Sequence, residues 1–251
     1  MSVRVVIPAR YGSSRLPGKP LVEIAGKPLV CHVCERGLES RAEEVWLATD
    51  DERIAAAVED MPVRVALTSG VHASGTDRIA EVAARENWED EDIVVNLQGD
   101  EPLMPADAID AVAASLQANP EAEMATLAVR LYEAELFADP HVVKLVTDTN
   151  GDALYFSRAP IPRPREADRE LPAEALRHVG LYAYRVAALA RLAAEPPCAM
   201  EREEGLEQLR ALWLGMRIRV EVADEIPMTS VDTAKDIART ERWLDGQTPE
   251  T

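Results

Sequence analysis

Short apolar runs and helical patterns alternate along the first 119 residues of the chain. The runs are rich in β-branched residues and predict buried strands at residues 3–8, 44–50, 63–67 and 92–98. Between them apolar positions recur at helical spacing, as in residues 105–120, where Ile109, Val112 and Leu116 lie three and four residues apart. Strands and helices in alternation predict an α/β fold, with a mostly parallel sheet covered by helices on both faces. In such folds ligands bind beyond the carboxyl ends of the strands.

The pattern changes after residue 120. Strand-like runs then follow one another with little helix between them, at residues 124–130, 142–148, 153–157 and 178–185. This succession predicts an inserted lobe with a mixed sheet over residues 122–190. Residues 159–172 within it combine several prolines with many charges, and they predict a mobile loop.

Beyond residue 190 the pattern predicts three more elements, a helix at about 202–214, a strand at 217–223 and a last helix from about 233. The first of these helices places Leu206, Leu209 and Trp213 on one apolar face. The chain has no internal repeat, so we expect residues 1–245 to form a single domain and residues 246–251 to be a frayed tail.

The overall charge of the chain is strongly acidic. Its 251 residues carry 45 Asp and Glu against 27 Lys and Arg, a formal net charge of -18. Nucleic acids and anionic membranes require broad basic surfaces, so we expect neither as a partner. No apolar stretch approaches the ~20 residues that cross a bilayer, and three cysteines are too few for a disulfide framework. These observations predict a soluble, cytoplasmic protein with reduced thiols.

The opening segment reverses this acidic balance. No acidic residue precedes Glu23, whereas Arg10, Arg15 and Lys19 fall in a turn-rich segment with glycines and with the hydroxyls of Ser13 and Ser14. Backbone N–H groups and fixed cations that converge in a loop after a strand favour phosphate binding. An ordinary solvated loop is the alternative, because the segment matches neither the P-loop nor the dinucleotide-binding glycine pattern.

Two carboxylates and one strand are candidates for the rest of a site. The strand at 92–98 runs into Gly99 and Asp100, which predicts a carboxylate at the ligand-binding edge of the sheet. Asp232 precedes the last helix, where a local reading favours an N-cap role. In residues 178–184, alternation places His178 and Tyr182 on a polar aromatic face, which suits a sugar and equally suits a half-exposed strand.

Two stretches resemble metal motifs without fitting them. Cys31 and Cys34 have C-x-x-C spacing, but they lie in a predicted helix and no second ligand pair completes a zinc site. We expect them to be core thiols. Residues 201–204 read EREE, which predicts a solvated helix start rather than a metal cluster.

Seven motifs occur in an order that resembles one enzyme family: PARYGSSRLPGKPL, SGTDRIAEV, VVNLQGDEP, ALYFSRAPIP, RHVGLYAYR, LEQLRALW and VDTAKD. Together they span roughly residues 3–243 and resemble the CMP-Kdo synthetase (3-deoxy-manno-octulosonate cytidylyltransferase) family. The resemblance implies a Rossmann-like nucleotidyltransferase fold and a homodimer. It also implies Mg²⁺-dependent transfer of CMP from CTP to the sugar acid Kdo, with release of pyrophosphate.

The resemblance also implies roles for individual residues. The expected catalytic residues are Arg10, Arg15, Lys19 and Asp100, and the expected Mg²⁺ ligands are Asp100 and Asp232. Nucleotide contacts are expected from Ala9, Arg10, Ser13, Ser14, Arg15, Lys19, Ser74 and Arg78. The sugar acid is expected to meet Gln98, Arg158, His178, Tyr182, Glu207 and Gln208, and the lobe at 122–190 to serve sugar binding and dimerisation.

Other activities stay open at this stage. A related cytidylyltransferase could use 8-amino-Kdo or another ulosonic acid, because one hydroxyl-to-amine change depends on a single pocket contact. A noncatalytic nucleotide-binding regulator of the same fold is a further alternative. The presence of Lys19, Asp100 and Asp232 argues against such a regulator.

Overall fold

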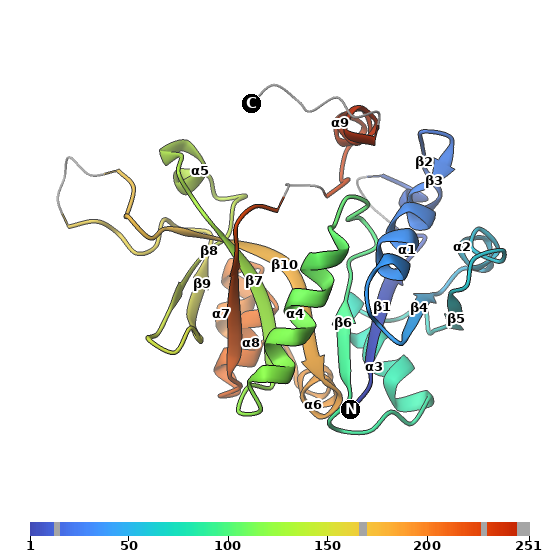
Figure 1. Ribbon diagram of the computed structural model, residues 1–251, viewed down its shortest axis with the longest axis horizontal. Helices are drawn as coiled ribbons and strands as arrows, with labels where there is room; N and C mark the ends of the chain where they lie inside the picture. Colours follow the sequence, from blue (N-terminus) through green and yellow to red (C-terminus); the bar gives the residue numbers. More distant parts are fainter. Residues whose placement is uncertain (13–15, 166–169, 227–229, 245–251) are drawn as a thin grey trace.

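The strands of the parallel core lie close to the positions that the sequence predicts. A computed structural model describes residues 1–12, 16–165, 170–226 and 230–244 (Figure 1). Its core strands are β1 (Val3–Ala9), β4 (Glu44–Thr49), β5 (Arg64–Leu67) and β6 (Ile93–Asn96). Strand β1 pairs in parallel with β4 and β6, and β4 pairs in parallel with β5. These strands confirm the four sequence predictions, with no end shifted by more than two residues.

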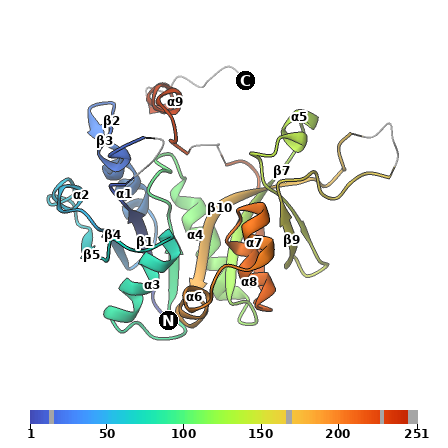
Figure 2. The same cartoon turned by 180° about the vertical axis from the view of Figure 1, so that it is seen from behind.

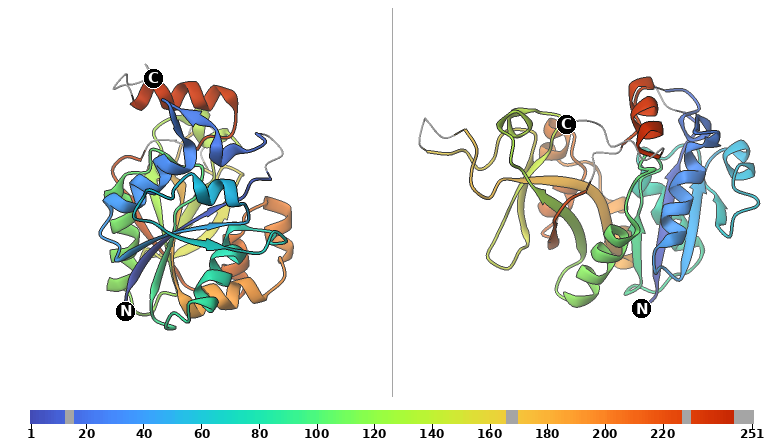
Figure 3. Two further views of the ribbon diagram at one scale, coloured as in Figure 1. Left: turned by 90° about the vertical axis from the view of Figure 1, so that its right-hand side faces the viewer. Right: turned by 45° about the horizontal axis from the view of Figure 1, so that its top comes forward.

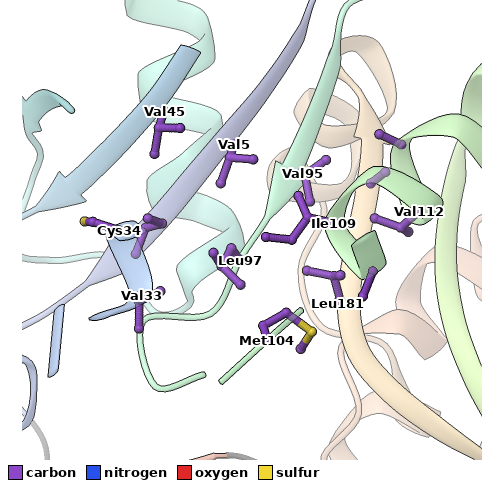
Figure 4. Close-up of a cluster of buried hydrophobic side chains, with 14 of the residues drawn as sticks. Val5, Val33, Cys34, Val45, Val95, Leu97, Met104, Ile109, Val112 and Leu181 are labelled. Atoms are coloured by element: carbon purple, nitrogen blue, oxygen red, sulfur yellow. The ribbon is translucent and has the colours of Figure 1, made fainter. Parts of the chain in front are cut away.

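Helices cover both faces of this sheet, as Figures 1 and 2 show. Successive residues of β1 alternate between two cores: Val5 and Ile7 pack in one and Val6 in the other, and none of the three is exposed. The first core is closed by α1 (Leu29–Glu39) and α4 (Ala106–Ala118). Its side chains interdigitate in Figure 4. The second is closed by α3 (Gly75–Arg85) and α6 (Val186–Ala194).

The strands after residue 120 extend the same sheet. Strand β10 (Leu176–Arg185) pairs antiparallel with β6 on one side and with β7 (Met124–Arg130) on the other. Strand β11 (Ile218–Ala223) adds in parallel to β7, whereas β8 (Lys144–Thr147) and β9 (Ala153–Ser157) form an antiparallel extension. The sheet is therefore mixed, and the order of its main path is β11-β7-β10-β6-β1-β4-β5.

The remaining elements are short or peripheral. They are the 3₁₀ helix η1 (Lys19–Leu21), β2 (Glu23–Ile24), β3 (Lys27–Pro28), α2 (Glu52–Ala56), α5 (Ala134–Ala138) and α9 (Ala234–Leu244). Figure 3 shows α9 beside the β2–β3 hairpin, and the amide of Ala25 there donates to Glu241 Oε1 at 3.3 Å. No helix among the described residues has the length and apolarity needed to span a membrane.

The single helix expected at about 202–214 is wrong, because the structure has two helices there. The chain at 199–213 forms two helices, α7 (Ala199–Glu204) and α8 (Gln208–Trp213). Gly205 ends α7 in the left-handed conformation with φ 62°, which glycine adopts without steric cost. The break also corrects the predicted apolar face, because Leu206 and Leu209 are buried whereas Trp213 is 62% exposed. The predicted tail at 246–251 lies outside the described residues, and the domain boundaries stay a prediction.

Candidate active site

A cavity of about 260 Å³ opens beyond the carboxyl ends of β1 and β6. This is the edge at which a parallel α/β sheet binds its ligands. Eight of the residues predicted from the sequence line it: Ala9, Arg10, Lys19, Ser74, Arg78, Gln98, Asp100 and Asp232. The structure thus gathers residues from five separate stretches of the chain around one cavity. Ser13, Ser14 and Arg15 lie outside the described residues.

Two glycines allow the segments that form the wall of this cavity to pack closely together. A Cβ atom on Gly99 would lie 2.6 Å from the carbonyl oxygen of Pro8, a distance that real Cβ atoms do not adopt. A Cβ atom on Gly75 would lie 3.1 Å from Cγ of Pro8. The end of β1, the turn after β6 and the start of α3 therefore meet at closer range than side chains permit. This packing brings Asp100 and Ser74 to the same cavity.

Lys19 joins the two predicted metal ligands. Its Nζ lies 2.7 Å from Oδ2 of Asp100 and 2.9 Å from Oδ1 of Asp232. The left-handed Gly18, with φ 68°, starts the short helix that carries Lys19, and the amide of Val231 donates to the carbonyl of Asp100 at 2.9 Å. Burial opposes the charge of Lys19, but the ion pairs with both carboxylates outweigh it and raise the pKa of the ammonium.

The position of Asp232 bears on its two predicted roles, as the N-cap of the last helix and as a Mg²⁺ ligand. At the start of α9 the carboxylate of Asp236 accepts the amides of Asp232 and Thr233, at 3.1 and 2.8 Å. Asp236, in the first turn of α9, therefore bonds the backbone that precedes the helix, as the N3 acid of a capping box does. The side chain of Asp232 instead faces Lys19 across the cavity.

The donor set at this position suits a magnesium ion completed by phosphate oxygens. Asp100 and Asp232 both reach one ammonium nitrogen, so their carboxylates are close enough to face one cation. Mg²⁺ is commonly held by one or two carboxylates together with substrate phosphates. Among the described residues, no three His, Cys, Asp or Glu side chains gather as a metal-binding group.

The start of α3 forms another wall of the cavity. Ser74 caps the helix: its hydroxyl accepts the amide of Asp77 while the Asp77 side chain accepts the amide of Ser74. Arg78, one turn into the helix, is only 2% exposed although it lines the cavity. Its Nη2 lies 3.0 Å from Oδ2 of Asp50, which pairs the buried charge.

The predicted sugar-binding residues, apart from Gln98, lie outside this cavity lining, directly after β9, on β10 and at the start of α8. Glu207 connects the two regions, because its carboxylate accepts a hydrogen bond from the hydroxyl of Thr76 in the first turn of α3. Burial raises the pKa of Glu207. Tyr182 and Gln208 are buried, and neither Tyr182 OH nor Gln208 Nε2 has a hydrogen-bond partner within the described part of the chain.

His178 and Arg158 are held by the protein itself. His178 Nε2 lies 3.0 Å from the hydroxyl of Thr126, and the ring packs between Phe156 and Tyr182 at centroid distances of 5.1 and 5.3 Å. Burial lowers the pKa of His178 to about 3, so the ring is neutral at physiological pH. Arg158 donates from Nε to the carbonyl of Glu204 at 2.7 Å.

The acidic stretch at 201–204 differs from its prediction. Glu201 forms an ion pair with Arg210 at 3.0 Å, and the Glu201 side chain is only 11% exposed. Glu204 accepts the hydroxyl of Ser157 and the amide of Arg158. Two of these glutamates are therefore structural partners, and a solvated helix start is wrong for them. The expectation of core thiols is confirmed, since Cys31, Cys34 and Cys198 are free and buried.

The sequence reading missed three residues at the site: Asp50, His72 and Thr76. Asp50 follows β4 directly, and the strand-end argument that identified Asp100 would also have found it. His72 lines the cavity and bonds Glu81, but it stands in a loop without a recognisable motif. Thr76 lies within the motif SGTDRIAEV, but its bond to Glu207 joins segments far apart in sequence.

A mostly parallel α/β sheet with a cavity beyond its strand ends, lined by basic residues and two facing carboxylates, suits a nucleotidyltransferase. Residues 4–218 match the family model described as "Cytidylyltransferase". The chain is 52% identical over 248 residues to the 3-deoxy-manno-octulosonate cytidylyltransferase of Thioalkalivibrio sulfidiphilus, covering 97% of this chain and 99% of that protein. It is 51% identical over 251 residues to the protein of the same name from Methylococcus capsulatus, covering 98% of each. The chain belongs to the 3-deoxy-manno-octulosonate cytidylyltransferase, or CMP-Kdo synthetase, family.

Solved structures agree with this family and fold. A structure of CMP:2-keto-3-deoxy-manno-octonic acid synthetase complexed with CTP superposes with a TM-score of 0.90 at 41% identity, covering 98% of this chain and 100% of that one. A cytidylyltransferase from Leptospira borgpetersenii shares the fold, with a TM-score of 0.66 at 18% identity over 98% of this chain and 87% of that one. The predicted family and Rossmann-like nucleotidyltransferase fold are confirmed.

Proposed function

We propose that the protein transfers CMP from CTP to 3-deoxy-manno-octulosonate in a Mg²⁺-dependent reaction that releases pyrophosphate. The cluster of Lys19, Asp100 and Asp232 in the strand-end cavity is the observation that carries this proposal. Attack of a sugar hydroxyl on the α-phosphate concentrates negative charge on phosphate oxygens. Catalysis is then mostly positioning and charge compensation, which these groups supply.

The charged end of the cavity takes the triphosphate. Arg10 and Lys19 line it, and Arg15 belongs to the same loop. We assign these three cations to the phosphates and to the departing pyrophosphate. Asp100 and Asp232 would hold Mg²⁺, which would supply charge neutralisation at the phosphate oxygens.

The opposite end of the cavity suits the base and ribose. Arg78 is paired with Asp50, so this wall carries little net charge and gives a triphosphate little attraction. Ser74 and Ala9 complete the wall beside it. We assign these residues to cytosine and ribose, together with Ser13 and Ser14 of the opening loop. CTP then lies with its phosphates toward Lys19 and its base toward α3.

The sugar acid occupies the adjoining region formed by β10 and α8. Buried polar atoms are normally hydrogen-bonded. Tyr182 OH and Gln208 Nε2 are buried without a hydrogen-bond partner among the described residues, so a bound sugar acid can supply one. Glu207 and Gln98 supply carboxylate and amide partners for sugar hydroxyls, and Glu207 links this region to the nucleotide cavity through Thr76. Neutral His178 adds hydrogen-bonding capacity without charge. Arg158 is assigned to the sugar carboxylate.

We further propose a cytoplasmic homodimer with no nucleic-acid or membrane partner. Tyr132 and Leu154, within residues 122–190, are 79% and 60% exposed, which suits an apolar contact between two copies of this lobe. The free, buried cysteines suit a reducing compartment. Light scattering of the purified protein tests the dimer.

A pyrophosphate-release assay tests the proposed reaction. The protein is incubated with CTP and Mg²⁺ and with a panel containing Kdo, 8-amino-Kdo and other ulosonic acids. The proposal expects release with Kdo and loss of release when EDTA removes the metal. Faster release with 8-amino-Kdo would reassign the sugar, and CTP binding without release for any sugar would identify a nucleotide-binding regulator.

A further inference from the structure

Asp50 directly follows β4 and contacts both α3 and the opening loop beside the cavity. Its Oδ2 accepts Nη2 of Arg78 at 3.0 Å, and its Oδ1 accepts the amide of Tyr11 at 3.3 Å. The side chain of Asp50 is 19% exposed and that of Arg78 is 3% exposed. One carboxylate therefore joins α3 to the opening loop, beside the cavity that Arg78 lines.

The Arg78 side of this link is fixed from two directions. Nη1 of Arg78 donates to the hydroxyl of Thr68 and, at 3.3 Å, to the carbonyl of Ser69. Asp50 supplies the carboxylate for Nη2, and it is the only ion-pair partner of Arg78 within the described part of the chain. Since both terminal nitrogens are held, the guanidinium has one orientation in the cavity wall.

The Tyr11 side of the link is fixed as well. The carbonyl of Tyr11 accepts the amide of Gly18 at 3.3 Å, and the guanidinium of Arg53 lies 3.7 Å from the centre of the Tyr11 ring. Tyr11 follows Arg10, and Gly18 precedes Lys19. The hydrogen bond from the Tyr11 amide to Asp50 therefore anchors the chain beside Arg10 and links it, through Gly18, to Lys19.

We propose that Asp50 is a positioning residue for CTP: it sets the direction of the Arg78 guanidinium and anchors the opening loop, so that the nucleotide enters a cavity that is already formed. This inference rests on the proposed function. An unpaired carboxylate beside the cavity would repel an anionic nucleotide, so the charge of Asp50 favours binding only because it pairs with Arg78. Preorganisation of this kind lowers the cost of ordering on binding.

Replacement of Asp50 by asparagine separates the two contacts. The amide oxygen still accepts the Tyr11 amide, but the negative charge is lost and the buried Arg78 keeps an uncompensated charge. Asp50 touches no reacting atom in this assignment, so its loss weakens binding of ground state and transition state alike. We expect the KM for CTP to rise about 10-fold and kcat to change less than about 3-fold.

The test compares D50N, R78Q, the double variant D50N/R78Q and the control D110N. Asp110 is a matched acid away from the cavity: it is 20% exposed and also accepts an amide and faces an arginine, both from Arg41. Steady-state kinetics with CTP and Kdo, CTP titration calorimetry and thermal melts are measured for each. D110N should keep the wild-type KM.

The double variant decides whether Asp50 acts through Arg78. In the R78Q background D50N should raise the KM for CTP by less than about 2-fold, since the guanidinium that it orients is gone. The same rise in both backgrounds, or a wild-type KM in folded D50N, would overturn the inference. If D50N does not fold, D50E keeps the charge while moving the carboxylate, and a wild-type KM for D50E would overturn it too. Failure of the wild-type protein to form product concerns the proposed function instead, and CTP titration of the same variants still tests the role of Asp50.

Discussion

Replacement of Lys19 by methionine tests the centre of the site. Methionine keeps much of the length and apolar volume of lysine but removes the ammonium that lies 2.7 Å from Asp100 and 2.9 Å from Asp232. The side chain of Lys19 is 13% exposed, whereas those of the two aspartates are 32% and 30% exposed. The variant therefore leaves two partly solvated carboxylates facing each other without a cation.

The stability cost follows from this intermediate exposure. Removing one partner of a fully buried ion pair costs about 3–5 kcal/mol, and an exposed pair contributes about 0–1 kcal/mol. We expect about 2 kcal/mol for Lys19, since solvent screens the carboxylates. For a chain of this size that corresponds to a fall in Tm of about 4–8 °C.

The effect on catalysis is expected to be larger than the effect on stability. A cation aimed at the departing pyrophosphate acts on charge that develops in the transition state, and loss of one such group lowers kcat by about 10²–10³. Mg²⁺ should raise the Tm of the variant more than that of the wild type, because the two carboxylates lack the ammonium that competes for them.

The dependence on pH has a definite sign. Since the pKa of Lys19 is raised in the folded protein, its contribution to stability is complete below the ordinary lysine pKa and is lost as the pH rises through the raised value. The difference in stability between wild type and K19M should therefore stay constant between about pH 6 and about pH 9.

Thermal melts with and without Mg²⁺ and steady-state kinetics are the assays. K27M is the matched control, because Lys27 is 42% exposed and pairs only with the surface residue Glu35 among the described residues. Its kcat should equal that of the wild type. A K19M enzyme with normal kcat and a raised KM for CTP would show that Lys19 only binds the nucleotide. An unchanged Tm would refute the energetic reasoning.

Three further predictions concern the same cavity and the charge of the chain. D100N should melt near the wild-type temperature yet lose most of its turnover at ordinary Mg²⁺, because the amide keeps the size of the side chain but not the charge that holds the metal. A turnover near that of the wild type would remove Asp100 from the mechanism. G99A should lower both Tm and CTP affinity, since its Cβ would lie 2.6 Å from the Pro8 carbonyl, whereas G70A, with no atom within 4 Å, should change neither. Raising KCl from about 0.1 M to about 1 M at fixed Mg²⁺ should raise Tm in thermal melts, because salt screens the net charge of -18. The same change should weaken CTP binding in titrations, because salt also screens the basic loop. A flat or falling Tm would contradict the self-repulsion argument.

The sequence by itself determined the elements and much of the list of site residues. Strand and helix patterns are local, so buried strands such as Val3–Ala9 could be read from a few neighbouring residues. The strand-end position of Asp100 followed from the same local pattern. The basic opening loop stood out because its charge opposes that of the rest of the chain. The motif series added the family, which the comparisons confirm.

Only the tertiary structure decided which of these residues meet. Lys19 and Asp232 are 213 positions apart, and no local pattern records that sheet formation brings them to one cavity. Two acids lie near the start of α9, and only the folded chain shows that Asp236 bonds the backbone preceding the helix while Asp232 faces Lys19. A strand-end position marks Asp50 as a candidate in the same way as Asp100, but only the tertiary structure shows its role. Its partners lie on other elements, and the buried charge that it compensates belongs to Arg78.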